Sequence, residues 1–255
     1  MQDDTIMIAH IDVLGNIQTV REHLLGTAEK AKKFAVEFGC GEAGFLCGLL
    51  HDIGKYSAAF QKRIRNPLPS NRVDHSTAGA VEMQKLSKNY IYIVLGMAVA
   101  GHHSGLLDGG NAITAEDGTY FGRLKKKLED YSHWKEDLSS EFSESSLAAL
   151  PKYCLESGFS VSFFIRMIFS CLVDADYLDT EDFMEKSQVK RGGYDSLEIL
   201  RHRLEAYVSR WLEAKSTEAG VNAELSKNRN SILLECMENG ENYSRGLYTL
   251  TVPTG

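Results

Sequence analysis

Residues 48–57 read GLLHDIGKYS. Apolar residues precede the His51-Asp52 pair at helical spacing, so we predict a buried helix from about residue 42 to Gly54. Neighbours on a helix point about 100° apart. The two side chains can still share one site if Asp52 bridges two metal ions, because a carboxylate has two oxygens and a neutral imidazole cannot bridge.

Helical patterns continue on both sides of this stretch and predict an all-α fold, since the chain has only four prolines and is rich in helix-forming residues. Thr19 and Glu22 form a capping box that marks one helix start. Asp74 is a candidate N-cap for another. The expected helices cover residues 19–38, 42–54, 57–65, 75–87, 89–101, 119–131, 145–157, 159–177, 194–215 and 228–237. We expect an irregular lead-in at 1–18, loops at 66–71 and 104–118, and a short β-prone run at 246–252.

Histidines gather at the expected helix ends, where side chains from separate helices can converge. They are His23, His51, His75, His102 and His103. Acids follow at Asp174 and Asp176, near the end of a later helix, where the helix dipole disfavours a negative charge without a cation or partner. Imidazole and carboxylate together suit Mn, Fe, Co, Ni or Zn. Each residue alone has a structural explanation, but the whole set favours a metal site among the core helices.

The charge of the chain limits how it could hold nucleic acid. The formal net charge is -7, whereas a protein that binds DNA mainly through its overall field is basic. DNA binding would need local patches, bound metal ions or a neighbouring domain. The candidate patches are Lys62, Arg63 and Arg65, and the run Lys125, Lys126 and Lys127, although each alone is better explained as a solvated helix face.

The cysteines and the apolar runs indicate where in the cell the protein is expected. Five cysteines occur without a C-x-x-C pair, which argues against a thiolate zinc site. Their odd number, without a signal peptide, favours a reducing cytoplasm. The uninterrupted apolar run from Ile91 to Ala100 is too short to span a bilayer, so we expect no membrane association.

These motifs resemble the HD-type nuclease domain of the CRISPR-associated helicase-nuclease of type I systems, within the HD superfamily. The resemblance runs through REHLLGTA with His23, GLLHDIGKYS, DHSTAGA with His75, AGHHSG and LVDADYLDTE. It implies an HD-domain helical bundle with a dinuclear metal site. One ion would take His23, His51, Asp52 and Asp176, and the other Asp52, His75, His102 and His103. Asp176 is favoured over Asp174, because it stands in an A-D-x-L context.

The resemblance also implies an activity. The chain would cleave single-stranded DNA during CRISPR interference, as an endo- or exonuclease, by two-metal phosphodiester hydrolysis. Asp52 and Lys55 would be the catalytic residues, with Asp52 shared by the ions and Lys55 a positive contact for phosphate. The expected cofactors are two divalent ions, Mn, Fe, Co or Ni, with Mg possible. The expected partners are single-stranded DNA and an RNA-guided surveillance complex of the Cascade type.

The C-terminal run GLYTLTVPTG resembles the first strand and half of the ATP-binding loop of the helicase that follows this nuclease. The sequence stops before the lysine of that loop, so we expect no ATP hydrolysis. The resemblance predicts a nuclease domain at residues 1–215, then a linker and the truncated start of a helicase domain at 216–255. A lone strand there would lack partners. We expect a monomer.

Two other functions remain open on the sequence. HD-type nucleotide phosphohydrolases use much the same ligands. The domain could also be a catalytically silent docking module for a helicase, although no ligand position of the motif set is missing.

Overall fold

The structure, a computed structural model, describes residues 6–67, 73–86, 89–113, 116, 118–141, 151–186, 192–216 and 223–252. The chain divides into two compact units, Met1–Lys190 and Arg191–Gly255. The sequence placed its boundary between residues 215 and 216 instead. The difference arises because α9 (Leu197–Ser216) packs against α10 (Ala223–Asn242) within the second unit.

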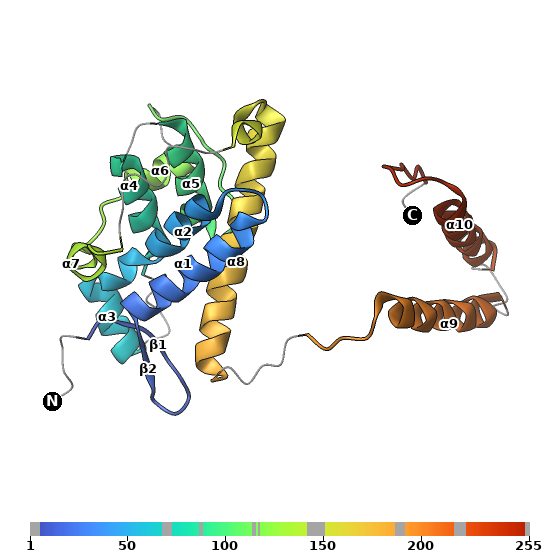
Figure 1. Ribbon diagram of the computed structural model, residues 1–255, viewed down its shortest axis with the longest axis horizontal. Helices are drawn as coiled ribbons and strands as arrows, with labels where there is room; N and C mark the ends of the chain where they lie inside the picture. Colours follow the sequence, from blue (N-terminus) through green and yellow to red (C-terminus); the bar gives the residue numbers. More distant parts are fainter. Residues whose placement is uncertain are drawn as a thin grey trace. The chain divides into compact units, whose positions relative to one another are not determined.

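The first unit is a helical bundle with one small sheet, which confirms the predicted all-α fold class (Figure 1). Its elements are β1 (Ile8–Ile11), β2 (Ile17–Thr19), α1 (Val20–Val36), α2 (Gly41–Leu50), the 3₁₀ helix η1 (Ile53–Tyr56), α3 (Ala58–Arg65), α4 (Ser76–Leu86), α5 (Tyr90–Gly101), α6 (Tyr120–Leu124), α7 (Trp134–Leu138), the 3₁₀ helix η3 (Lys152–Leu155) and α8 (Gly158–Met184).

Helix α1 begins at the predicted capping box. The hydroxyl of Thr19 accepts from the backbone N–H of Glu22 at 3.1 Å, and the Glu22 carboxylate accepts from the backbone N–H of Thr19 at 2.8 Å. These two bonds satisfy donors that the first helical turn leaves without partners. They fix the start of the helix that carries His23 one turn further on.

Helices α1 and α2 approach each other at glycines. A Cβ on Gly48 would lie 2.5 Å from the Cα of Ala28, and a Cβ on Gly44 would lie 2.5 Å from the carbonyl oxygen of Ala31. Only a residue without a side chain fits at such a distance from a neighbouring backbone. This contact brings the C-terminal end of α2, with His51, next to His23 on α1.

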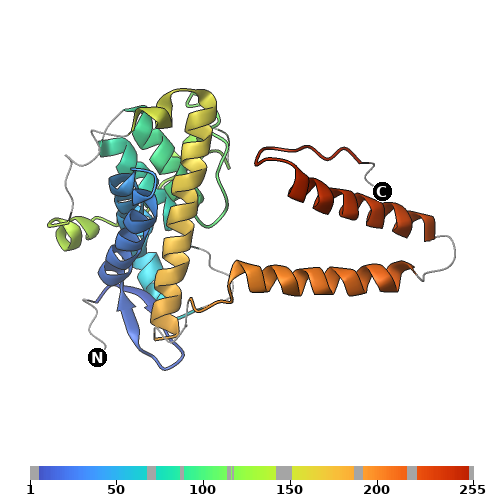
Figure 2. The same ribbon diagram turned by 45° about the vertical axis from the view of Figure 1, so that its right-hand side comes forward.

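Helix α8 completes the core. It lies along α1, α2 and α5 (Figure 2). One stripe of its side chains is buried. The stripe comprises Phe164, Ile168, Cys171, Leu172 and Ala175. By length and composition α8 is the one helix among the described residues that could cross a membrane. The prediction from the run 91–100 overlooked it, because polar residues such as Arg166 interrupt its apolar side chains. In this structure 28% of that apolar stretch is buried.

The N-terminal prediction was wrong. Within residues 1–18, the described part from residue 6 is not simply irregular, because β1 and β2 pair antiparallel, with His10 opposite Gln18 and Ile11 opposite Ile17. The Asp12 carboxylate accepts from the backbone N–H groups of Leu14 at 2.9 Å and Asn16 at 2.8 Å and holds the turn. Such an Asx turn, with strands of only four and three residues, leaves little alternation to detect in the sequence.

The prediction of a C-terminal strand was also wrong. Residues 247–252 have no regular secondary structure, because no strand of the second unit's described residues pairs with them, and residues 253–255 lie outside the described part. Other helix bounds differ. Helix α2 ends at Leu50, before the expected end at Gly54, and the helix expected at 119–131 is shortened to α6. In place of the helix expected at 145–157, residues 152–155 form a 3₁₀ turn, and residues 142–150 lie outside the described part. Helices α8 and α10 are longer than expected.

The glycine contact makes a stability prediction. We expect Gly48→Ala to lower the free energy of unfolding by about 1–3 kcal/mol, because its methyl group would meet the α1 backbone. Urea unfolding followed by circular dichroism measures the change. Gly158→Ala is the control, since a Cβ there meets nothing within 4 Å, and its effect should stay within about 0.5 kcal/mol. Equal stability of Gly48→Ala and the parent protein would contradict the packing argument.

Candidate metal centre

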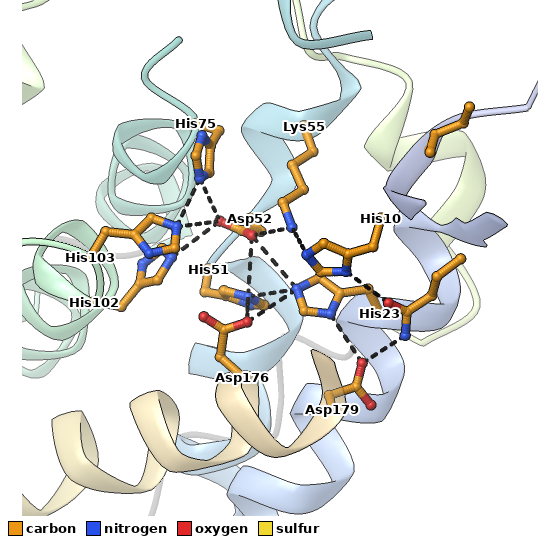
Figure 3. A network of polar contacts seen from close by, with 12 residues as sticks. His10, His23, His51, Asp52, Lys55, His75, His102, His103, Asp176 and Asp179 are labelled. Atoms are coloured by element: carbon orange, nitrogen blue, oxygen red, sulfur yellow. Dashed lines mark hydrogen bonds and ion pairs between the residues drawn. The ribbon is translucent and has the colours of Figure 1, made fainter. Parts of the chain in front are cut away.

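The bundle brings the seven predicted ligand residues to one place, although they come from six helices or helix ends (Figure 3). Two lie within helices: His23 on α1 and Asp176 on α8. The others lie at helix ends: His51 after α2, Asp52 before η1, His75 before α4, and His102 and His103 after α5. Asp174, the alternative acid, is exposed on α8.

The first group comprises His23, His51, Asp52 and Asp176. The Nε2 atoms of His23 and His51 are 3.2 Å apart. Oδ1 of Asp176 lies 3.3 Å from Nε2 of His23 and 3.5 Å from Nε2 of His51. Oδ2 of Asp52 lies 3.6 and 3.5 Å from the same two nitrogens. Two imidazole nitrogens and two carboxylate oxygens therefore face one point.

The second group comprises Asp52, His75, His102 and His103. Oδ1 of Asp52 lies 3.2 Å from Nε2 of His102, 3.7 Å from Nε2 of His75 and 4.0 Å from Nε2 of His103. The Nε2 atoms of His75 and His103 are only 2.8 Å apart. Asp52 thus gives one oxygen to each group, the arrangement that would let it bridge two ions.

The backbone around Asp52 explains how adjacent residues reach the same site. Helix α2 ends at Leu50, and Asp52 has φ -123° and ψ 23°, outside the helical region. The 100° separation of neighbours on a continuous helix therefore does not apply to His51 and Asp52. The sharp change of direction turns the carboxylate in between the two sets of imidazoles.

Backbone carbonyls orient three of the imidazoles. The Nδ1 atom of His51 lies 2.7 Å from the Gly48 carbonyl, that of His102 lies 2.7 Å from the Val99 carbonyl, and that of His75 lies 3.0 Å from the Val73 carbonyl. Because a carbonyl can only accept, each Nδ1 carries the hydrogen and donates it. Such a ring, when neutral, presents the lone pair of Nε2 to the site.

These atoms fit a cation. Lone pairs that face each other across 2.8 Å, as in His75 and His103, repel unless a cation or a proton lies between them. The two oxygens of Asp52 and Nε2 of His102 are buried, and their charge contacts do not include a hydrogen bond of normal geometry. Buried polar atoms without such partners call for an ion or water. Imidazole and carboxylate donors suit divalent transition metals.

Charges of both signs meet in the pocket. Burial opposes a charge on Asp52, but the Lys55 ammonium and the imidazoles outweigh burial and hold its pKa well below the usual range. Burial also opposes a charge on His23, but nearby carboxylates, Asp176 foremost, raise its pKa to about 9. Without a metal the pocket therefore favours a proton on His23. A bound cation would displace that proton, because ligand imidazoles are neutral.

The two groups differ in access. The side chains of His23 and His51 are 0% exposed, whereas His75 is 17% and His103 50% exposed. Burial and the neighbouring His102 lower the pKa of His103 to about 4, so its ring is neutral at neutral pH. The site therefore opens to solvent on the side of His75 and His103.

Lys55 lies inside the site and not at its opening. Its Nζ is 2.8 Å from Oδ2 of Asp52 and 3.2 Å from Nε2 of His10, and its side chain is 5% exposed. The sequence missed His10, which lies in the segment expected to be irregular. It also missed Asp179, whose carboxylate lies 3.0 Å from Nδ1 of His23. The three-residue spacing from Asp176 could have revealed Asp179, because residues three apart share a helix face.

A family model matches part of the chain. The HD domain family matches residues 20–131, which include all the ligand candidates except Asp176. None of the curated proteins matches the chain. HD domains bind divalent metals, are generally metal-dependent phosphohydrolases and are typically soluble. The family match and the His/Asp groups together support hydrolase activity. The chain therefore contains an HD domain at residues 20–131, which supports its place in the HD superfamily.

Proposed function

We propose that this chain is a metal-dependent nuclease that hydrolyses phosphodiester bonds of single-stranded DNA. The observation that carries the proposal is the sharing of Asp52 between two His/Asp groups, with one carboxylate oxygen directed to each. Such pairs of neighbouring sites are typical of enzymes that cut phosphodiesters. The sequence motifs that resemble a CRISPR-associated nuclease select nucleic acid as the substrate.

The ligand residues would form two sets, one for each ion. His23, His51 and Asp176 would hold one divalent ion, His75, His102 and His103 the other, and Asp52 would hold both. Such ions supply charge neutralisation for the phosphate and an activated water molecule. Lys55 is buried against Asp52, so its charge acts first on that carboxylate and only through it on the site.

Local charge near the open side would guide the substrate, because the net charge of -7 repels DNA. The Arg123 guanidinium donates to the hydroxyl of Ser104 at 3.1 Å, directly after His103. Lys126 Nζ lies 3.5 Å from the Asp74 carboxylate, directly before His75, and its side chain is 47% exposed. These two cations flank the exposed imidazoles, where a phosphodiester would arrive. The choice of single-stranded over double-stranded DNA rests on the resemblance of the motifs.

The cellular setting is a further part of the proposal. We place the nuclease in CRISPR interference in the cytoplasm, as a monomer that works with an RNA-guided surveillance complex and with a helicase. The resemblance of residues 246–255 to part of a helicase ATP-binding loop supports this setting.

The first prediction concerns the shared carboxylate. Purified protein with Mn²⁺, Co²⁺, Ni²⁺ or anaerobic Fe²⁺ should cut circular single-stranded DNA, and EDTA should stop the reaction. Asp52→Ala should lower the rate by at least about 100-fold, the scale of losing one charge-stabilising group in a transition state. A gel assay measures the cutting. A panel of nucleotides run beside the DNA tests the phosphohydrolase alternative, and preferred hydrolysis of a nucleotide would overturn the nuclease proposal.

The second prediction separates chemistry from folding. We expect His103→Ala to lose most of the cleavage rate, about 100-fold or more, while its thermal unfolding in EDTA stays unchanged, because the side chain is half exposed. His133→Ala is the matched control, since His133 is 63% exposed and contacts Glu136 outside the centre. Cleavage that survives His103→Ala, or that falls equally in His133→Ala, would remove the second metal position from the proposal.

The third prediction concerns the path of the strand. Lys126→Ala should weaken kcat/KM and make its dependence on salt shallower, by about 0.7 in the slope of log kcat/KM against log salt, the effect of one phosphate contact on a single strand. Lys32→Ala is the control, because Lys32 pairs with Glu42 and its side chain is 38% exposed. An unchanged slope in Lys126→Ala would move the strand away from this side of the site.

A further inference from the structure

We propose that Asp179 is a positioning residue, which holds the His23 imidazole in the orientation that ligates a metal. The inference rests on the proposed metal centre, since it concerns how one ligand of that centre is held. Asp179 lies on α8, one helical turn beyond Asp176. It belongs to neither ligand group, because its carboxylate faces the opposite edge of the imidazole (Figure 3).

The contact between the two residues is direct. Oδ2 of Asp179 lies 3.0 Å from Nδ1 of His23, and both side chains are buried, at 7% and 0% exposure. The other edge of the ring, at Nε2, lies 3.3 Å from Oδ1 of Asp176. Because residues three apart lie on one helix face, α8 approaches the His23 ring with two carboxylates, one at each nitrogen.

His23 differs in this respect from the other buried imidazoles. His51 and His102 donate from Nδ1 to the carbonyls of Gly48 and Val99, which lie three residues earlier in the same chain segment. His23 receives its acceptor from a different helix, and that acceptor is a carboxylate. A carboxylate behind a ligand imidazole fixes its tautomer and raises the basicity of the other nitrogen.

Asp179 is itself held in place on several sides. The Lys30 ammonium lies 2.8 Å from Oδ1, and the side-chain N–H of Gln18 donates to Oδ2 at 2.9 Å. On α1, Gly26 leaves the space that the carboxylate occupies, because a Cβ there would lie only 2.0 Å from Oδ1. Three polar contacts therefore fix this carboxylate, from Gln18 on β2 and from His23 and Lys30 on α1. An ion pair with Lys30 at the surface would not need the other two.

A structural role for Asp179 can be separated from the positioning role by a neighbouring acid. Asp182 lies one further turn along α8, where its Oδ2 is 3.3 Å from Lys30 Nζ. It shares the Lys30 contact, whereas the carboxylates paired with His23 are those of Asp52, Asp176 and Asp179. Asp182→Ala therefore removes one of the two carboxylates that pair with Lys30, and it leaves Asp179 in contact with the His23 imidazole.

The test measures metal binding directly. Titration of the full chain with Mn²⁺ in a calorimeter gives the number of ions and the affinity of each site. The Mn²⁺ electron paramagnetic resonance spectrum reports whether two ions are coupled. We expect two ions in the parent protein. Asp179→Ala should weaken one of them by about 10- to 100-fold and leave the other nearly unchanged. At low Mn²⁺ concentration, the resonance signal of coupled ion pairs should then be weaker than in the parent protein.

A second variant protects the test against misfolding. Gly26→Ala keeps every carboxylate but displaces that of Asp179, and it should lower the affinity of the same site. Alanine favours helix over glycine, so the loss could not come from a weakened α1. Unfolding in EDTA checks the fold of each variant, and Asp182→Ala should bind Mn²⁺ as the parent does.

The outcomes are distinct. Two tightly bound ions in Asp179→Ala would overturn the positioning role and leave the proposed function standing. An equal loss in Asp182→Ala would also overturn it, because the effect would then come from Lys30. Less than one ion in the parent protein would overturn the metal centre and, with it, both the proposed function and this inference.

Discussion

A carboxylate that is removed from water is unstable unless cations or donors surround it, and Asp52 is in this position. Its charge is compensated by Lys55 on one side and by imidazoles on the others. The ends of α2, α4 and α5 and the inner face of α8 all have to converge for this compensation. The burial of one anion thus constrains the relative placement of most helices in the bundle.

The sequence predicted much of this arrangement because the residues involved are marked locally. The capping box at Thr19 and the apolar helix before Gly101 lie where the pattern placed them. The adjacent His51 and Asp52 stand out without any knowledge of packing. Helix ends around one core converge, so histidines at several such ends were expected to meet, and the structure brings them together.

The rest depended on contacts between segments far apart in the chain. The spacing from Asp176 puts Asp179 on the same helix face, but the sequence does not show that its carboxylate contacts His23 or that Gly26 leaves space for it. The β1–β2 hairpin, which carries His10 and Gln18, has strands too short to show an alternating pattern. The predicted C-terminal strand failed for the opposite reason, since β-prone residues form no strand without a neighbour to pair with.

The unequal exposure of the two groups has a consequence for how the centre would fill. An ion at His23 and His51 would sit behind fully enclosed rings, whereas one at His75 and His103 would face solvent. The enclosed position should exchange slowly and the open one quickly. Protein that has passed through a chelating column should therefore retain a single ion, and the order of loading would be set by accessibility and not by affinity alone.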